Sequence, residues 1–161
     1  MKQVRDEGLA ILLVVAMLAL VAGCGTASAG APHTRDAASV VATLKAAGLP
    51  IGDSAAYTAA TDPNALLGRP GQYVSKVNFW DSRVQRSSPN EITPGDGGSV
   101  ETFANTTDAA ARLKYVTALA ASAPLFNEYD YQVGTVVLRL SHFLTPDQAT
   151  QYQSELKKIA G

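Results

Sequence analysis

The sequence predicts an α+β fold in which an antiparallel sheet of about four strands has about three helices covering one face. Two observations predict this fold. Apolar stripes at helical spacing recur near the start, the middle and the end of residues 36–161. The segments between them are typical of strands, in the order helix, two strands, helix, two strands, helix. Strands joined by hairpins form antiparallel sheets.

The first helix is predicted over residues 36–47. Gly48 and Pro50 end it, and Asp36 is the candidate N-cap. Its apolar residues recur at i, i+3, i+4 and i+7, and they are Ala37, Val40, Val41 and Leu44.

A possible short strand follows at residues 54–61. Asp62 and Pro63 are typical of an N-cap and a first-turn proline, so one helical turn is expected before Gly68. Residues 69–71, Arg-Pro-Gly, break the chain.

Residues 73–81 alternate between a more apolar and a more polar face, which predicts a half-covered strand. Residues 82–98 form a loop of roughly 17 residues, long enough to be either functional or disordered. A second strand is expected at 100–104.

The middle helix is predicted to begin at Thr107 and Asp108 and to close at Pro124. Its apolar side holds Ala109, Leu113, Val116 and Ala120.

Residues 128–141 are rich in Tyr, Val and Leu, but one strand of that length would run about 46 Å. We therefore expect a hairpin or a strong bulge at Gly134. The run 145–148, Thr-Pro-Asp-Gln, is a capping box. It leads a last helix with one apolar face: Ala149, Tyr152, Leu156 and Ile159.

The N-terminus is typical of a secretory signal. Lys2 and Arg5 precede an apolar run over residues 9–22, about 14 residues where a membrane-spanning helix needs roughly 20. The residues at the end of this run and just after it, Val21-Ala22-Gly23-Cys24, resemble the lipobox of bacterial lipoprotein signal peptides. That resemblance implies cleavage before Cys24 and lipidation of its thiol. The alternative is an ordinary secretory signal cut near Ala27 or Ala29, with Cys24 incidental.

These features predict three parts: a signal peptide over residues 1–23, a flexible tether over 24–35 and a single domain over 36–161. A diacylglycerol on Cys24 carries two acyl chains, which suffice for stable anchoring. The expected location is the outer, extracytoplasmic face of the cell membrane, with the membrane as a partner through Cys24.

Composition excludes several function classes. The 161 residues include 13 Lys and Arg and 14 Asp and Glu, which gives a net charge of −1. A near-neutral chain with scattered basic residues does not have the excess positive charge that is typical of nucleic-acid-binding proteins. One Cys and two His supply neither an intramolecular disulfide nor an ordinary structural zinc site. We therefore expect no metal and no cofactor.

Two runs in the mature part carry a further resemblance. Residues 65–73, Ala-Leu-Leu-Gly-Arg-Pro-Gly-Gln-Tyr, and residues 128–131, Glu-Tyr-Asp-Tyr, are similar to small extracytoplasmic lipoproteins of actinobacteria. The resemblance implies a place in the cell envelope and a fold, but no activity.

Candidate catalytic groups are few. Ser141 and His142 are adjacent and point to opposite sides of a strand, and His33 lies in the tether. Asp81 and Glu101 have the residue types of a glycosidase pair, but solvated strand positions are the expected interpretation. The protein is therefore not expected to be an enzyme.

Large and ligand-friendly side chains flank the strand at residues 73–81. Arg69, Gln72 and Tyr73 enter it, and Trp80 and Arg83 leave it. One interpretation is structural, with Tyr73 in the core and Trp80 shielding the sheet edge. The other is a candidate binding surface, in which a bare sheet face and the loop 82–98 recognise an envelope protein or ligand.

Three functions fit these expectations. The first is a membrane-anchored binding or interaction module. The second is a carrier of a small molecule or ion, which needs a pocket of several hundred Å³. The third is an envelope hydrolase, which needs convergent carboxylates or a base with a perturbed pKa.

Overall fold

The computed structural model describes residues 35–123 and 127–161. All of them belong to one unit of the chain, Pro32–Gly161. The predicted signal peptide, Cys24, His33 and Pro124 lie outside the described residues. None of the helices within that described part is long and apolar enough to cross a membrane.

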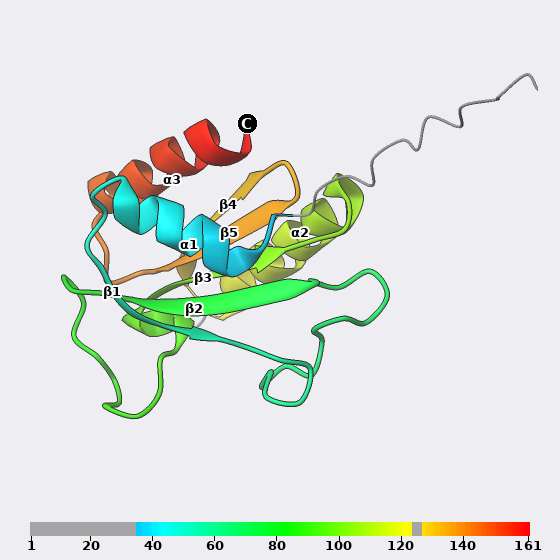
Figure 1. The fold of residues 1–161 in the computed structure, drawn as a ribbon, viewed down its shortest axis with the longest axis horizontal. Helices are drawn as coiled ribbons and strands as arrows, with labels where there is room; N and C mark the ends of the chain where they lie inside the picture. The colour runs from blue at the N-terminus through cyan, green and yellow to red at the C-terminus, as the bar shows by residue number, and fades with distance from the viewer. Residues whose placement is uncertain (1–34, 124–126) are drawn as a thin grey trace, which may run out of the picture. The chain divides into compact units, whose positions relative to one another are not determined.

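Five antiparallel strands form one sheet in the order β1-β2-β3-β5-β4 (Figure 1). The α+β class and the antiparallel sheet are confirmed, with one strand more than expected. The fifth strand is β1, which overlaps the possible short strand expected at residues 54–61 but begins earlier, at Ile51. It lies at the edge of the sheet, where its pairing with β2 shifts register between Ile51 and Ser54. The strands are β1 (Ile51–Ala56), β2 (Ser75–Asp81), β3 (Gly97–Thr102), β4 (Glu128–Val133) and β5 (Val136–Ser141).

Three α-helices begin where side-chain caps are present. Asp36, Asn105 and Thr145 each accept a hydrogen bond from a backbone N–H of the first turn. The predicted capping box is formed, since Gln148 Oε1 accepts from the N–H of Thr145 at 2.9 Å. The helices are α1 (Ala37–Ala46), α2 (Thr106–Ser122) and α3 (Pro146–Ala160), and a short 3-10 turn, η1 (Pro94–Asp96), precedes β3.

Helices α1 and α3 cover one face of the sheet and lie side by side above it in Figure 1. The predicted stripes of both helices are buried there, except that Ile159 is only partly buried. The ring of Phe79 on β2 stacks on Tyr152 of α3, with centroids 5.6 Å apart. The main core therefore includes Val40, Leu44, Val77, Phe79, Val100, Leu138, Leu140, Tyr152 and Leu156.

Helix α2 packs on the opposite face, so the expectation of three helices on one face is wrong. Adjacent β5 residues show this, because Val136 belongs to the main core while Val137 packs with Ala109 of α2 in a second core. The buried stripe of α2 holds Arg112 between Ala109 and Val116. The second face needs a cover of its own, because it carries buried Val137 and the charged Glu101, which pairs with Arg112.

The segment between β1 and β2 is a series of turns rather than the helical turn expected at residue 62. Asp62 does accept from the N–H groups of Leu66 and Leu67, at 2.9 and 3.1 Å. Ala65 and Gly68, however, have left-handed φ values of 51° and 80°. A right-handed helix cannot continue through such residues.

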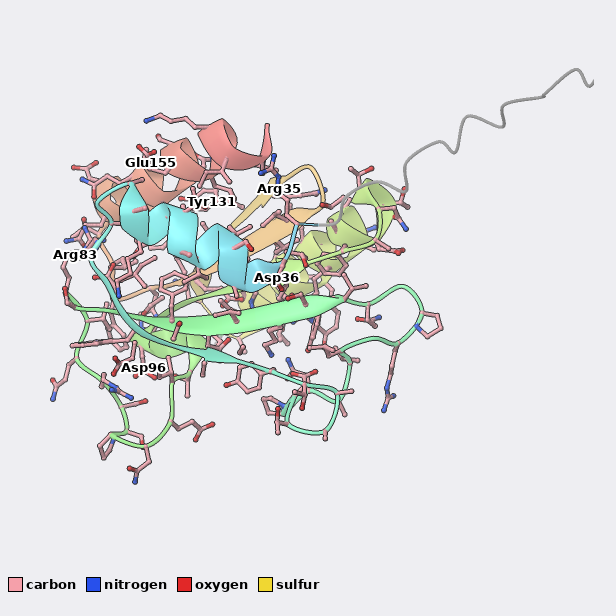
Figure 2. The ribbon with its side chains drawn as sticks, viewed as in Figure 1. Arg35, Asp36, Arg83, Asp96, Tyr131 and Glu155 are labelled. Carbon is pink, nitrogen blue, oxygen red and sulfur yellow. The ribbon has the colours of Figure 1, made fainter. Side chains whose placement is uncertain are left out.

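The long loop between β2 and β3 is tied to the sheet. Asp96, labelled in Figure 2, is buried and accepts from the N–H groups of Ser87 and Thr93 at 2.6 and 2.7 Å. The carbonyl of Ile92 accepts from Asn78 Nδ2 of β2 at 2.9 Å. These bonds hold the middle of the loop against the second face of the sheet.

Strand β3 begins at Gly97, earlier than expected, because its first two residues are glycines that resemble a turn in sequence. A Cβ at Gly98 would lie 2.6 Å from the carbonyl oxygen of Arg139 and 2.7 Å from the ring of Phe79. The absence of a side chain lets the neighbouring strand and the core close around this position.

Candidate ligand-binding cleft

The sheet face under α2 is polar although it is mostly buried. Burying a charge is costly unless the group is paired and hydrogen-bonded, so the partners of these side chains determine what this face can do. Its polar residues come from three central strands: Lys76, Asn78, Ser99, Glu101, Arg139 and Ser141.

Glu101 on β3 is the centre of a charge network. Arg112 of α2 donates from Nε to Glu101 Oε2 at 2.7 Å and from Nη2 to Oε1 at 2.8 Å. Arg139 of β5 donates from Nη1 to Glu101 Oε1 at 3.3 Å and holds both oxygens of Glu128, at 2.9 and 3.0 Å. The charges of these two arginines and two glutamates balance.

Asp130 adds a third carboxylate to this network. It lies opposite Arg139 in the β4–β5 register. Burial and then the charge of Glu128 raise the pKa of Asp130 to about 7, and the attraction of Arg139 offsets only part of that rise. Asp130 Oδ1 has no hydrogen-bond partner within the described residues. At neutral pH the network therefore carries a partial net negative charge.

A second buried ion pair holds the segment between β1 and β2 against the sheet. Lys76 Nζ lies 3.1 Å from Asp62 Oδ1, and the hydroxyl of Tyr73 donates to Asp62 Oδ2 at 2.6 Å. Burial alone raises the pKa of Asp62, but the hydrogen bonds from Tyr73, Leu66 and Lys76 outweigh it and hold the pKa well below its usual range. The charged carboxylate thus fixes both the segment and the start of β2.

A cleft of about 650 Å³ lies between this segment and α2, within the usual range for ligand pockets. Four of the residues that line it are polar: Asn64, Gln72, Arg112 and Arg139. The apolar lining includes Leu66 of the segment and, from α2, Tyr115, Val116 and Leu119.

The guanidinium of Arg112 lines the cleft and uses only part of its hydrogen-bonding capacity within the described residues. The group lies over the rings of Tyr73 and Tyr115, with its Cζ atom 5.7 and 5.6 Å from their centroids. Its Nε and Nη2 atoms bond to Glu101, and Nη1 donates no hydrogen bond to any other described residue. Tyr115 is 58% exposed and so lies at the open side of the cleft. The site thus offers one oriented, cationic donor beside an apolar wall.

Only one of the five predicted surface residues lines the cleft. This residue is Gln72. Tyr73 is fully buried, as the structural interpretation of this residue expected, and Arg69 is exposed in the preceding turn. The sheet face is not bare, since α2 and the loops cover it.

The other two predicted residues lie at the far end of β2. In Figure 2, Arg83 lies near one end of α1, and Asp36, the N-cap of this helix, lies at the other end. Trp80 is half-buried and donates from Nε1 to the carbonyl of Val84 at 2.8 Å. Arg83 holds both carboxylate oxygens of Asp81, at 2.9 and 2.7 Å. The predicted residues therefore belong to two separate sites.

The carboxylates considered for catalysis are not solvated, which corrects the expectation for both. Asp81 and Glu101 are fully buried. Asp81 accepts from the hydroxyl of Tyr152 under α3 at 2.7 Å, whereas Glu101 faces α2. Each is stabilised by an arginine, Arg83 for Asp81 and Arg112 for Glu101, which is why burial is tolerated. On opposite faces, the two cannot act as a pair.

The other two residues considered for catalysis, Ser141 and His142, contact other parts of the chain. The hydroxyl of Ser141 donates to the carbonyl of Gly95 at 2.7 Å, and the exposed ring of His142 lies against Phe143 with centroids 4.0 Å apart. Residues 35–123 and 127–161 contain no group of three His, Cys, Asp or Glu side chains that could hold a metal ion.

Sequence reasoning missed Arg112, Arg139 and Tyr115. One signal was available, because Arg112 lies three residues after Ala109 and four before Val116, both buried. Arginine on the apolar side of a helix indicates a buried acidic partner.

Comparisons with protein-family models, with curated proteins and with solved structures find no match to this chain.

Proposed function

We propose that this protein is a lipid-anchored, extracytoplasmic binding protein that takes a small molecule into the cleft between α2 and the segment preceding β2. The apolar run at residues 9–22 and the lipobox-like residues before Cys24 support the anchor. The anchor keeps the binding domain at the outer face of the cell membrane.

The cleft is the single observation that carries the binding role. Its volume, its apolar wall and the Nη1 donor of Arg112 are the features that ligand sites combine. A protein partner at the other end of β2 has less support, because Trp80 and Arg83 already bond within the chain.

Intact-mass measurement of the protein from membranes tests the anchor. We expect a chain that begins at Cys24 and carries a diacylglycerol, and we expect Cys24→Ser to leave an uncleaved precursor or a protein released from the membrane. An unmodified mature chain that begins near Ala29 would contradict the anchor.

Native mass spectrometry of the full-length protein, released from membranes in the gas phase, tests the binding role. We expect a retained small molecule that is lost in Tyr115→Ala and kept in the matched control Phe143→Ala. Both rings are exposed, 58% and 68%, and only Tyr115 lines the cleft. Equal retention by the two variants would contradict binding in the cleft.

A further inference from the structure

The charges around the cleft restrict the kind of ligand that it can hold. Of the residues that the structure describes, Arg112 and Arg139 are the two charged ones that line it, and both are already paired with carboxylates. The negative charges of Glu101 and Glu128 balance the positive charges of the two arginines. Asp130 lies beside these ion pairs on the same sheet face. A carboxylate or phosphate head would therefore meet no excess positive charge.

An ammonium head is disfavoured for a different reason. Glu101 is fully buried, and both of its oxygens already accept hydrogen bonds from arginines. Both oxygens of Glu128 accept from Arg139. A cationic ligand would have to displace an arginine before it reached either carboxylate, and Asp130, whose Oδ1 has no partner within the described residues, is not among the residues that line the cleft.

Free hydrogen-bonding groups remain in the cleft, although its charges are balanced. Arg112 Nη1 can donate, since it bonds to no described residue. Asn64 uses its amide nitrogen on the hydroxyl of Tyr73 at 3.3 Å, and its Oδ1 accepts from no described residue. The Gln72 side chain likewise makes no hydrogen bond within the described part of the chain, so it can both donate and accept.

From this arrangement we infer that the cleft selects an uncharged amphipathic ligand, with a carbonyl or amide head that accepts from Arg112 and an apolar body that packs against Leu66, Tyr115 and Leu119. The inference rests on the proposed function and names the chemical class of its ligand. A space of about 650 Å³ is within the usual range of sites that bind drug-sized molecules.

Three matched probes test the class: 3-phenylpropionamide, 3-phenylpropionate and 3-phenylpropylammonium. They share one apolar body and differ in the charge of the head. Ligand-observed saturation-transfer NMR would follow each on the full-length protein in lipid nanodiscs, with empty nanodiscs to subtract partitioning into the bilayer. Molecules of about eleven non-hydrogen atoms bind with dissociation constants on the order of 1 mM, which this method detects.

We expect the amide to bind and the two charged probes to bind about tenfold more weakly or worse. Tyr115→Ala and Gln72→Ala should each weaken amide binding by about tenfold, and Phe143→Ala should leave it unchanged. Thermal melting of each variant, expected to match that of the unaltered protein, separates lost binding from lost folding.

The inference is overturned if either charged probe binds as tightly as the amide, if amide binding is insensitive to Tyr115→Ala, or if no probe binds. A charged probe that binds in a Tyr115-dependent way would leave the proposed function standing with a different ligand class. Failure of all three probes, together with no small molecule retained in native mass spectrometry, would overturn both.

Discussion

Arg112 of α2 and Glu101 of β3 form a bidentate ion pair, with distances of 2.7 Å from Nε to Oε2 and 2.8 Å from Nη2 to Oε1. The two side chains are 7% and 0% exposed. This pair joins α2 to the second face of the sheet and also positions the guanidinium in the lining of the cleft. One contact therefore contributes to both packing and the candidate site.

Removing the two partners should have unequal effects on stability. Glu101→Leu leaves Arg112 and Arg139 without their shared carboxylate, whereas Arg112→Leu leaves Glu101 still bonded to Arg139. We expect Glu101→Leu to lower the free energy of unfolding by about 3–5 kcal/mol, and Arg112→Leu to lower it by less. Urea unfolding measures both, and the opposite order would contradict the network as described.

Stability should fall as the pH rises through the range in which Asp130 titrates. The pKa of Asp130 is about 7 in the folded chain and near its ordinary value of 3.8 when unfolded. Between these values the folded state binds more protons, so stability is highest near the lower value and is lost toward the higher one. Glu128, Glu101 and Arg139 are the charged groups that face it.

Asp130→Asn should remove that decline, and it should stabilise the protein at pH 8 relative to the unaltered chain. Melting temperatures from pH 4 to pH 8 test this, with exposed Asp147→Asn on α3 as the control. An unchanged pH dependence in Asp130→Asn would show that another group is responsible.

The hydroxyl of Tyr73 should stabilise the fold through Asp62. It donates at 2.6 Å to a buried, charged carboxylate, and hydrogen bonds of that kind contribute about 1.5–3 kcal/mol. We expect Tyr73→Phe to lose about that much stability in urea unfolding. Tyr115→Phe is the matched control, since Tyr115 is exposed, and it should lose almost nothing. Equal effects would contradict the role of Asp62 as the organiser of this segment.

Trp80 should be a structural residue. Its ring lies over Gly52, where a Cβ would come within 2.5 Å of Trp80 Cε3, and Arg86 lies 5.7 Å from the ring centroid. We expect Trp80→Ala to cost about 2 kcal/mol, below the roughly 3–5 kcal/mol of a fully buried aromatic. Trp80→Phe, which loses the bond to Val84, should cost about 1 kcal/mol. A Trp80→Ala variant of unchanged stability would restore this end of β2 as a candidate binding surface.

The parts of the fold that follow apolar periodicity were predictable. The stripes of α1 and α3, the capping box at Thr145 and the hairpin at Gly134, where φ is 55°, all confirm sequence expectations. Each depends on local spacing or on one residue with a distinct backbone preference.

The second face was not predictable in the same way. Its packing depends on charged residues such as Glu101 and Arg112, which meet only when the chain folds. Local sequence patterns predict that charged residues of this kind are exposed. The register that sets Glu101 beside Arg139 depends on pairing between β3 and β5, which are 38 residues apart at this bond. Among the residues that line the cleft, Gln72 was the one that the sequence predicted as a binding residue, because the others share no local motif.

Photo-crosslinking in living cells tests the central claim most directly. A benzophenone amino acid at position 115 would stand at the open side of the cleft, and one at position 143 would serve as the control on a different exposed site. We predict that position 115 captures a small molecule, with a mass in the range of drug-sized ligands, and that position 143 does not. A protein-sized adduct at position 115, or the same small adduct at both positions, would contradict the claim that this cleft binds a small molecule.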